Sequence, residues 1–413
     1  MELKKYKLAD IGKVITGKTP STSIAENYAW GTIPFYTPED VAKGLGMMGR
    51  NSRFISKTGF EEIASNTISG ESVLVGCIGS DMGNVAYSNI TCATNQQINA
   101  ITQFKNGIEP LYVYYLLSTM KSYFQKIAGS TTTPILPKSV FEEIEIHLPD
   151  MKKQKDVVSI LYALDRKIEL NKQINDNLEA MAKQLYDYWF VQFDFPNEEG
   201  KPYKSSGGAM VWNEKLKREI PQGWSNGVLS DVANITMGQS PDGSSYNEDG
   251  EGIIFYQGST DFGLRFPDIR QYTTSPSRYA NKGDILMSVR APVGALNIAN
   301  NDCCIGRGLS ALSSKIGSMT HLYYLMNDFR LKFEGMNSAG TTFGSITKNE
   351  LFSLPVIIPT KSVFSEFEQV CEPIFYKQMI IGEEINALTK QRDELLPLLM
   401  NGQASVNYHL SDD

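Results

Sequence analysis

The sequence predicts an α+β protein with two tandem related α+β domains, separated and joined by two long helices packed as an antiparallel coiled coil. Three observations predict this fold. The second half of the chain repeats the first, each copy shows short apolar runs bounded by turn residues, and a long helical pattern follows each copy. The 413 residues are enough for two to four domains of the usual size, roughly 100–200 residues each.

The first of these observations is an internal duplication with a period of about half the chain. The string LADIGKVITGKTPS at 8–21 matches LSDVANITMGQSPD at 229–242, and STTTPILPKSVFEEIEIHLP matches GTTFGSITKNELFSLPVIIP further along. Between these strings, Cys92 falls opposite Cys303. Because the period far exceeds the roughly 20–50 residues of solenoid repeats, we expect each repeat to be a whole domain.

The two copies are β-rich, with a few helices. Short apolar or alternating runs such as ESVLVGCIG, NVAYS, DILMSV and ALNIA are bounded by Gly, Pro, Asn and Ser, which is typical of strands. Helical patterns occur at LYVYYLLSTMKSYFQKI in the first copy and at MTHLYYLMNDFRLKF in the second. We therefore predict one domain over 1–150 and another over 220–360, with a linker over 194–219.

A long helical segment follows each domain. The segment 151–193 contains neither Pro nor Gly, and Asp150 is a plausible N-cap for it. The second helical segment covers 361–405 and leaves a short tail over 406–413.

Heptad repeats predict that these two segments pack against each other as an antiparallel coiled coil. Asn171 and Asn175 lie in the apolar stripe of the first segment, where polar residues can set the register. In the second segment, Val370 and Leu398 are assigned to the d position. The alternative is a single long amphipathic helix lying on a globular core. The predicted seam contains Leu161, Leu164, Ile168, Leu178, Leu185 and Trp189 from the first segment and Phe367, Ile374, Ile381, Leu388 and Leu395 from the second.

Composition excludes several classes of protein. The net charge is −7, and the excess of acidic over basic residues is largest in 361–413, which has 4 basic and 9 acidic residues. Charge alone therefore does not indicate nucleic-acid binding. Three histidines and five cysteines without a C-x-x-C pair argue against a zinc enzyme or a disulfide framework. Without an apolar run of membrane-spanning length or an apolar N-terminal signal, we expect a cytoplasmic protein that contacts no membrane.

One motif suggests a different function. The string GKVITGKT at 12–19 fits the phosphate-binding pattern G-x-x-x-x-G-K-T, in which Lys18 would contact nucleotide phosphates. That loop requires a helix at its last residues, whereas Pro20 follows at once and the second copy has Gln239 in place of the lysine. A nucleotide-binding enzyme centred on Lys18 is therefore the alternative hypothesis.

Three longer strings carry a resemblance to a known family. KIELNKQINDNLEAMAKQLYDYWFVQFDFP, IPQGWSNGVLSDVANITMGQSP and LTKQRDELLPLLMNGQASV resemble the DNA-specificity (S) subunit of type I restriction–modification systems. The resemblance extends from residue 1 to about 406, and YDYWFVQFDFP followed by I-P-x-G-W is its most specific part. One departure is Lys153-Gln154, where the family often has Glu-Gln at the start of its helical regions.

The resemblance implies a function and a set of partners. It implies two target-recognition domains, each reading one half of a split site in double-stranded DNA. The helices would set the spacing and dock two methyltransferase (M) subunits, and restriction (R) subunits would complete the complex. S-adenosylmethionine and ATP would be used by these partners, so this chain would bind no cofactor or metal and would not be an enzyme by itself. A scaffold that binds the subunits but no DNA is a further alternative.

Comparison of the two copies then suggests residues for this function. Positions that are alike in both copies are expected to serve the fold or the DNA phosphates, and polar positions that differ are expected to read bases. Gln96-Gln97 stand opposite Arg307-Gly308, and Arg290 stands opposite Ile78. Arginine can bind guanine bidentately, and glutamine can do so to adenine. The DNA-binding candidates are Gln96, Gln97, Thr131, Thr132, Lys138, Arg290, Arg307, Thr341, Thr342 and Lys348, and the subunit-docking candidates are Leu161, Leu164, Ile168, Leu178, Leu185, Trp189, Ile381, Leu388 and Leu395.

Overall fold

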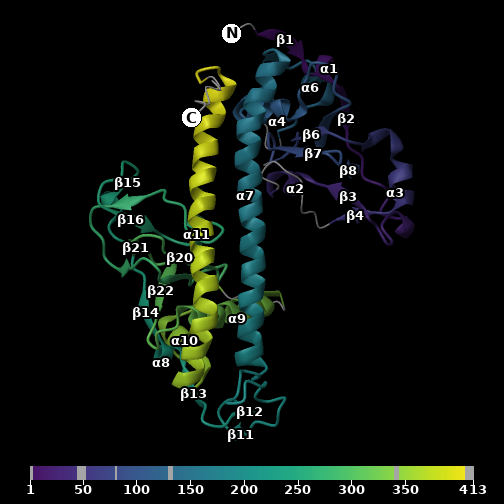
Figure 1. Cartoon of the computed structure of the whole chain (residues 1–413). Coiled ribbons are helices and arrows are strands. Elements are labelled where there is room, and N and C mark those ends of the chain that lie inside the picture. Colours follow the sequence, from purple (N-terminus) through teal and green to yellow (C-terminus); the bar gives the residue numbers. More distant parts are fainter. Residues whose placement is uncertain (1–2, 44–52, 80, 129–133, 339–343, 405–413) are drawn as a thin grey trace, which may run out of the picture. The chain divides into compact units, whose positions relative to one another are not determined.

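The computed structural model describes residues 3–43, 53–79, 81–128, 134–338 and 344–404 (Figure 1). Its contacts divide the chain into two compact units. The first unit consists of Met1–Ile168 and Leu388–Asp413, and the second of Glu169–Ala387. Each unit therefore combines one copy of the repeat with part of both long helices.

The first unit contains the first copy of the repeat. Its strands are β1 (Lys4–Lys7), β2 (Lys13–Thr16), β3 (Ile33–Tyr36), β4 (Phe54–Ile55), β5 (Thr67–Ile68), β6 (Ser72–Gly76), β7 (Val85–Ser88), β8 (Cys92–Thr94), β9 (Ile98–Thr102) and β10 (Glu145–Leu148). Its helices before the long ones are α1 (Leu8–Ile11), η1 (Ala25–Asn27), α2 (Pro38–Lys43), α3 (Lys57–Glu62), η2 (Ala64–Asn66), α4 (Pro110–Ser118), α5 (Lys121–Ile127) and α6 (Lys138–Glu142).

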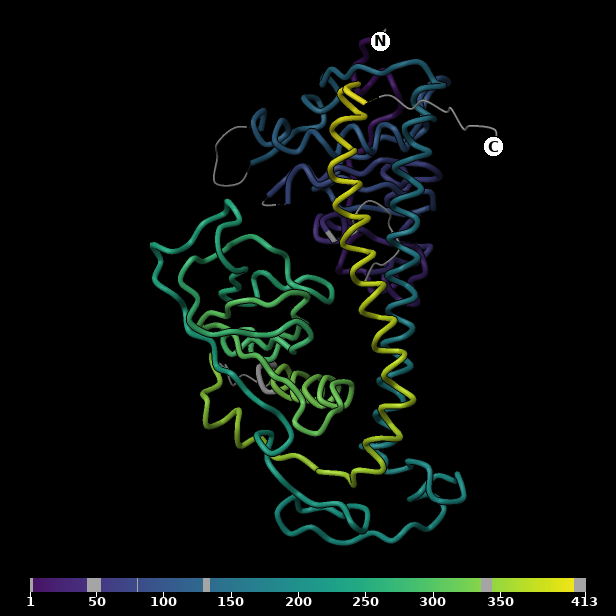
Figure 2. The backbone as a smooth tube through the Cα atoms, turned by 60° about the vertical axis from the view of Figure 1, so that its left-hand side comes forward, coloured from purple at the N-terminus to yellow at the C-terminus, as the bar shows by residue number. Residues whose placement is uncertain are grey.

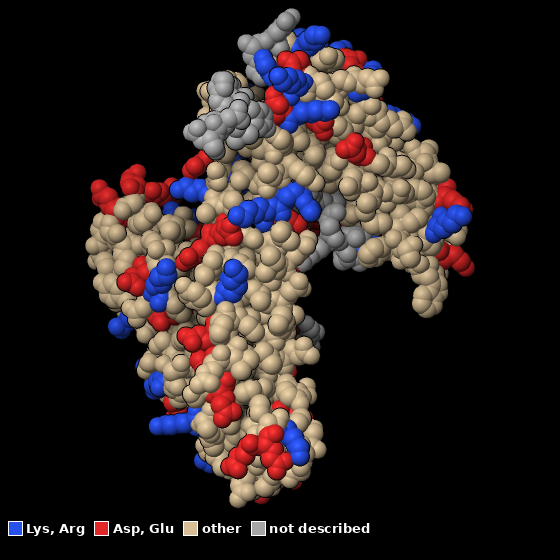
Figure 3. All heavy atoms as spheres, in the orientation of Figure 1, with Lys and Arg blue, Asp and Glu red and all other residues tan. Residues whose placement is uncertain are grey.

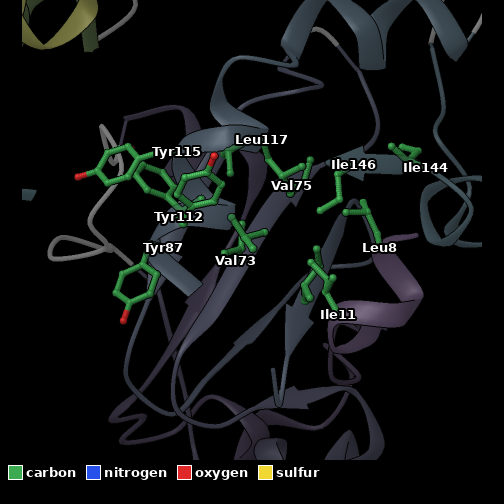
Figure 4. Close-up of a cluster of buried hydrophobic side chains, with 14 of the residues drawn as sticks. Leu8, Ile11, Val73, Val75, Tyr87, Tyr112, Tyr115, Leu117, Ile144 and Ile146 are labelled. Carbon is green, nitrogen blue, oxygen red and sulfur yellow. The ribbon is translucent and has the colours of Figure 1, made fainter. Parts of the chain in front are cut away.

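Two four-stranded sheets form the framework of this copy, with strand orders β2-β9-β6-β7 and β4-β3-β8-β5. Strand β6 is buried along its whole length, which explains its continuous apolar run. Side chains from α1, β6, α4 and β10 lie together in the core (Figure 4). Strand β1 pairs with β10, so the two ends of the copy are joined.

The second unit contains the second copy. Its strands are β11 (Met210–Asn213), β12 (Arg218–Pro221), β13 (Ser225–Val228), β14 (Ala233–Met237), β15 (Tyr246–Asn247), β16 (Ile253–Tyr256), β17 (Tyr272–Thr273), β18 (Tyr279–Ala280), β19 (Ile285–Ser288), β20 (Leu296–Ile298), β21 (Cys303–Ile305), β22 (Leu309–Ser314) and β23 (Pro355–Ile358). Its shorter helices are α8 (Leu229–Val232), η4 (Gly243–Ser245), η5 (Ser259–Asp261), α9 (Met319–Ser338) and α10 (Lys348–Phe352).

The two copies share their topology. The order β14-β22-β19-β20 in the second copy repeats β2-β9-β6-β7 in the first, and β13 pairs with β23 as β1 pairs with β10. In each second sheet the central strands are parallel, with Phe35 beside Ala93 in the first copy and Phe255 beside Cys304 in the second. This register places Cys92 and Cys303 at equivalent positions, which confirms the alignment predicted from the sequence.

The long helices are α7 (Met151–Tyr186), continued by the π-helical turn η3 (Asp187–Val191), and α11 (Lys361–Met400). Helix α7 begins as predicted, because the Asp150 carboxylate accepts a hydrogen bond from the backbone N–H of Lys153 at 3.0 Å. Within each unit, the two helices run side by side in opposite directions (Figure 2). The antiparallel coiled coil expected from the heptads is therefore present.

In the first unit, a buried polar group joins the two helices to the copy. Asp165 on α7 accepts hydrogen bonds from the Tyr115 hydroxyl at 2.7 Å and from Arg392 Nη1 on α11 at 3.1 Å. Its side chain is 6% exposed and that of Arg392 is 16% exposed. Burial and the neighbouring Asp165 charge raise the pKa of Tyr115, so its hydroxyl keeps the proton that it donates. Leu161 and Leu399 complete the contact in the apolar core.

In the second unit, polar pairs again cross the seam. Asn171 donates to Glu384 Oε2 at 2.9 Å, as expected for a residue that fixes the register. Further along, Glu179 Oε2 accepts from Gln378 Nε2 at 2.8 Å and from Arg265 Nη2 at 2.7 Å. Because Arg265 lies between β16 and β17, this group holds the second copy against both helices.

The seam of α11 differs from the prediction in one respect. Val370 and Leu398, assigned to d, are 48% and 40% exposed, so this assignment is wrong. The buried partners of the Phe367–Leu395 repeat lie four residues after its members instead of three. They are Cys371, Gln378, Ile385 and Leu399, together with the largely buried Arg392. Two of these are polar and have partners on α7, which explains why an apolar heptad pattern did not identify them.

The segment predicted as a linker is folded. Strand β11 lies within it and pairs as a hairpin with β12, which begins at its end and continues to Pro221, and Phe195 stacks on Trp224 with 5.1 Å between ring centroids. An aromatic cluster that includes Trp189, Phe193 and Phe367 connects this segment to both long helices of the second unit. Within the described residues, the structure has no helix that combines the length and the apolar character needed to cross a membrane.

Candidate nucleic-acid interface

A set of backbone hydrogen bonds brings three segments of the first copy together. The N–H of Cys77, just after β6, donates to the carbonyl of Gln97 in the turn between β8 and β9 at 2.8 Å. The carbonyl of Cys77 accepts from the N–H of Leu136 at 2.9 Å, and Gly79 donates to Pro134 at 3.2 Å. We call the described residues of these segments, 77–79, 95–97 and 134–136, the loop cluster of the first copy.

The second copy has the same set of bonds at the equivalent positions. Val289 donates to the carbonyl of Gly308 at 2.8 Å, and its own carbonyl accepts from Ile346 at 3.0 Å. Ala291 donates to Gly344 at 3.2 Å. The loop cluster of the second copy is therefore 289–291, 306–308 and 344–346.

This equivalence confirms two alignments made from the sequence. Ile78 forms an isolated bridge with Ile135, and Arg290 forms the corresponding bridge with Ser345, so Ile78 and Arg290 occupy the same place. The main-chain frame is thus shared by the two copies, and the side chains that it presents differ.

The shared glycines serve the fold. Gly17 donates its N–H to Ile98 at 3.0 Å, and a Cβ atom added to it would lie 2.2 Å from the Asn95 carbonyl oxygen. Gly238 makes the corresponding bond to Leu309, and a Cβ there would lie 2.1 Å from the Gly306 carbonyl oxygen. Only a residue without a side chain permits this close approach of the strand end to the loop cluster.

The residue two positions after each glycine contacts the loop cluster. The Thr19 hydroxyl donates to Gln96 Oε1 at 2.9 Å, and Ser240 Oγ accepts from the backbone N–H of Arg307 at 3.2 Å. Gln96 and Arg307 are both exposed, so each side chain is available to a partner although its base is fixed. Gln97 is only half-exposed, and its Oε1 accepts from Asn95 Nδ2 at 3.0 Å.

In the second copy, the two predicted arginines meet at one cavity. Arg290 and Arg307 line a pocket of about 190 Å³, with Gln257 after β16 on its wall. Both arginines are exposed. Among the described residues, no hydrogen bond or ion pair engages either guanidinium. The remaining lining residues are small or neutral: Gly258, Ser259, Thr260, Ala291 and Gly308. Sequence reasoning had missed Gln257, which lies more than 30 residues from either arginine.

The other DNA-binding candidates are placed differently. Lys138 and Lys348 are exposed and stand at the first positions of α6 and α10. Lys138 Nζ lies 3.5 Å from Glu142, and Lys348 Nζ lies 5.2 Å from the centre of the Phe352 ring. These local contacts engage both lysines without burying them. The candidates Thr131, Thr132, Thr341 and Thr342 lie outside the described residues.

The docking candidates divide by burial. Four of them are at most 5% exposed and pack inside the units, where they hold the helices and the copies together: Leu161, Ile168, Trp189 and Ile381. Leu164, Leu178, Leu185, Leu388 and Leu395 are half-buried. An exposed apolar stripe that sequence reasoning missed lies on the second-unit part of α7. It consists of Leu170, Ile174 and Met181, which are 53%, 37% and 53% exposed.

The structure does not support the nucleotide-binding alternative. Strand β2 ends at Thr16, and the next helical turn of the described chain is η1, which begins at Ala25, so no helix opens at Lys18. Among the described residues, no three His, Cys, Asp or Glu side chains gather as metal ligands would. His321 is buried among aromatic rings, and burial lowers its pKa to about 3. It is therefore neutral and is packed as an apolar group.

On the face in Figure 3, basic and acidic side chains are interspersed and leave broad uncharged areas. This agrees with the net charge of −7. This face therefore shows no general positive field of the kind that attracts a polyanion.

Comparisons with known proteins find similar chains of one family. A family model described as the type I restriction modification DNA specificity domain matches residues 1–180 and 221–391. The MjaIX specificity subunit of the type I restriction enzyme from Methanocaldococcus jannaschii is 29% identical over 97% of this chain and 93% of that protein. A second protein of that organism, described as the putative MjaX specificity subunit, is 33% identical over 73% of this chain and 70% of that protein.

A solved structure has the same fold. The crystal structure of a type I restriction–modification S subunit from M. genitalium matches with a TM-score of 0.60 and 15% identity. The match covers 97% of this chain and 96% of that one. This likeness shows that the fold occurs in an experimentally determined structure.

Proposed function

Because the chain belongs to the family of type I restriction–modification DNA specificity subunits, whose members recognise DNA without catalysing a reaction, we propose that it reads a bipartite DNA site with one half-site per copy. The observation that carries this proposal is the pair of loop clusters. The same main-chain frame presents Ile78 and Gln96 in one copy and Arg290 and Arg307 in the other. A shared frame with different polar side chains suits two readers of different sequences.

The helices provide the second part of the proposal. Two methyltransferase subunits dock on the long helices, and restriction subunits join the assembly. The exposed stripe of Leu170, Ile174 and Met181 supports this assignment, because apolar side chains in a row on a helix favour a protein partner over phosphate. The partners bind S-adenosylmethionine and ATP, and this chain binds neither.

The distance between the half-sites is set by the helices. Both α7 and α11 are continuous over 36 and 40 residues, and polar pairs fix their register in each unit. A pair of helices could act as a spacer, because each added residue lengthens a helix by about 1.5 Å.

A domain exchange tests the reading of half-sites. Residues 1–150 are replaced by the equivalent part of a related subunit, and the variant is expressed with its methyltransferase. Methylated bases are then mapped by single-molecule sequencing. We expect one half-site to change while the other and the spacer stay the same. A simultaneous change of both half-sites would contradict independent reading.

A second measurement separates a DNA reader from a scaffold that binds only protein subunits. The full chain with its methyltransferase is titrated against duplex DNA carrying the mapped site and against a scrambled duplex. A reader retards the first at much lower protein concentration. Equal affinity for both duplexes, in a complex that assembles normally, would favour the scaffold.

A further inference from the structure

We propose that the second copy reads a guanine through Arg290 and Arg307, and that the first copy reads an A·T pair at the equivalent position of its own half-site through Ile78 and Gln96. This inference rests on the proposed function and assigns the class of base pair to each loop cluster. It follows from the pocket of about 190 Å³ and from its equivalent in the first copy.

No hydrogen bond or ion pair among the described residues engages the guanidinium of Arg290 or Arg307, whereas three other arginines of the chain are engaged by carboxylates. Arg265, Arg270 and Arg392 are engaged by Glu179, Asp261 and Asp165. By contrast, Arg290 and Arg307 share a cavity whose lining contains no acidic residue. Two positive groups around one cavity repel each other, so this arrangement favours an occupant rich in acceptors.

The chemistry of the pocket fits the edge of a guanine. Guanine presents the acceptors N7 and O6 in the major groove, and a guanidinium donates to both at once. Gln257 adds an amide that can donate or accept on the pocket wall. The fixed bases of the arginines favour a defined geometry, because Arg307 donates its N–H to Ser240 and Arg290 is bridged to Ser345.

Phosphate is the other acceptor-rich group on DNA, and the duplication argues against it. Phosphates are identical in both half-sites, so residues that bind them should be alike in the two copies. The position of Arg290 is occupied in the first copy by Ile78, which cannot bind a phosphate. A position that changes from arginine to isoleucine on one main-chain frame therefore reads a base.

The first copy presents the groups that suit an A·T pair. The Gln96 side chain is exposed, and the Thr19 hydroxyl fixes its amide by donating to Oε1 at 2.9 Å. In this orientation Nε2 can donate to adenine N7, and Oε1 has a second lone pair for the adenine amino group. Ile78 is half-exposed and offers an apolar contact to the thymine methyl group.

The test exchanges these side chains between the copies in the full chain. The double variant Arg290→Ile with Arg307→Gln is expressed with the methyltransferase, and its methylated sites are mapped. We expect one G·C position in one half-site to become A·T or to relax. On the original site, we expect a loss of roughly 5- to 150-fold in methylation rate, the factor given by one bidentate base contact. The reverse variant, Ile78→Arg with Gln96→Arg, should change only the other half-site.

Arg278→Gln is the matched control. It matches the single variant Arg307→Gln, because it removes one positive charge from an exposed position of the same copy, and Arg278 does not line the pocket. Its methylated sites should be those of the unaltered chain. Thermal unfolding and co-purification with the methyltransferase check that each variant folds. If the double variant fails these checks, Arg307→Gln alone decides, because the hydrogen bond from Arg307 to Ser240 is made by the backbone N–H and is kept when the side chain is replaced.

The outcomes distinguish a failure of the proposed function from a failure of the guanine assignment. An unaltered chain that directs methylation to no bipartite site contradicts the proposed function. A bipartite site that the folded double variant leaves unchanged, or methylates more slowly without any change of sequence, contradicts the guanine assignment and indicates phosphate contacts. A half-site that responds to the arginines but contains no G·C pair overturns it as well.

Discussion

Replacing Arg392 by methionine should weaken the hold of α11 on the first unit. The substitution leaves the Asp165 carboxylate, 6% exposed, with the hydrogen bond from Tyr115 but without the positive charge at 3.1 Å. Removing one partner of a buried pair costs about 3–5 kcal/mol. The Tyr115 bond remains and Arg392 is 16% exposed, so we expect the lower end, about 3 kcal/mol.

Hydrogen exchange followed by mass spectrometry measures this loss locally. A change of about 3 kcal/mol accelerates exchange of the 388–400 amides by roughly 150-fold when exchange requires local opening. Lys390→Met is the control, because Lys390 is 79% exposed and its pair with Glu394 spans 4.0 Å. Exposed pairs contribute about 0–1 kcal/mol, so exchange in this variant should change little.

The double variant Arg392→Met with Asp165→Leu tests whether the unpaired buried charge of Asp165 causes the loss of stability. It removes both charges of the buried pair. Besides the exposed contact of Arg392 with Asp393, which both variants lose, the remaining cost is the lost acceptor of the Tyr115 hydroxyl, about 1 kcal/mol. The double variant should therefore be more stable than Arg392→Met alone. If it is less stable, or if Arg392→Met behaves like Lys390→Met, an uncompensated buried charge is not what destabilises the first unit.

Three further predictions concern pH, the glycine-lysine motif and the spacer. Burial lowers the pKa of His321 from 6.5 to about 3, so below pH 6.5 the unfolded chain binds a proton that the folded chain does not, and stability is lost as the pH falls. Replacing His321 by phenylalanine should remove about 1 kcal/mol per pH unit of this pH dependence between pH 5 and 6, measured by urea unfolding. An unchanged slope would mean that carboxylates cause the pH dependence. Replacing Lys18 by alanine should change the methylation rate of the assembled complex by no more than a few-fold, because no helix begins at Lys18 to form a phosphate-binding loop. Complete loss of methylation in a folded complex would support the nucleotide-binding hypothesis instead. Inserting seven residues after Leu178 and another seven after Leu388 adds about 10.5 Å to each helix, a length equivalent to roughly three base pairs. The spacer of the methylated sites should therefore change by about two to four base pairs, with reduced activity. An unchanged spacer at full activity would mean that the helices do not set the spacer length.

The repeat was the part of the fold most accessible from the sequence. Matching turn residues and strand patterns aligned Cys92 with Cys303 and Ile78 with Arg290, and the strand registers confirm both alignments. Such alignments succeed because glycines at sites of close approach, such as Gly17, have no substitute.

The sequence was less informative where distant residues meet. Gln378 and Arg392 are polar, so an apolar heptad pattern assigns them to the surface and places Val370 in the seam. Their burial depends on Glu179 and Asp165, which lie about 200 residues away along the chain. Gln257 was missed for the same reason, because only the folded sheet brings it beside the arginines.

The pairing of Asp165 with Arg392 also has a consequence for synthesis of the chain. The two residues are 227 positions apart, and ribosomes add about 5–20 residues per second. The nascent first unit therefore waits roughly 10–45 seconds for the segment 388–400 that completes its core. During that interval Leu161 and Asp165 lack their partners on α11 and are open to chaperones, proteases and other chains. A messenger truncated before α11 should consequently yield a protein that is cleared by proteolysis, even though its first copy is encoded in full.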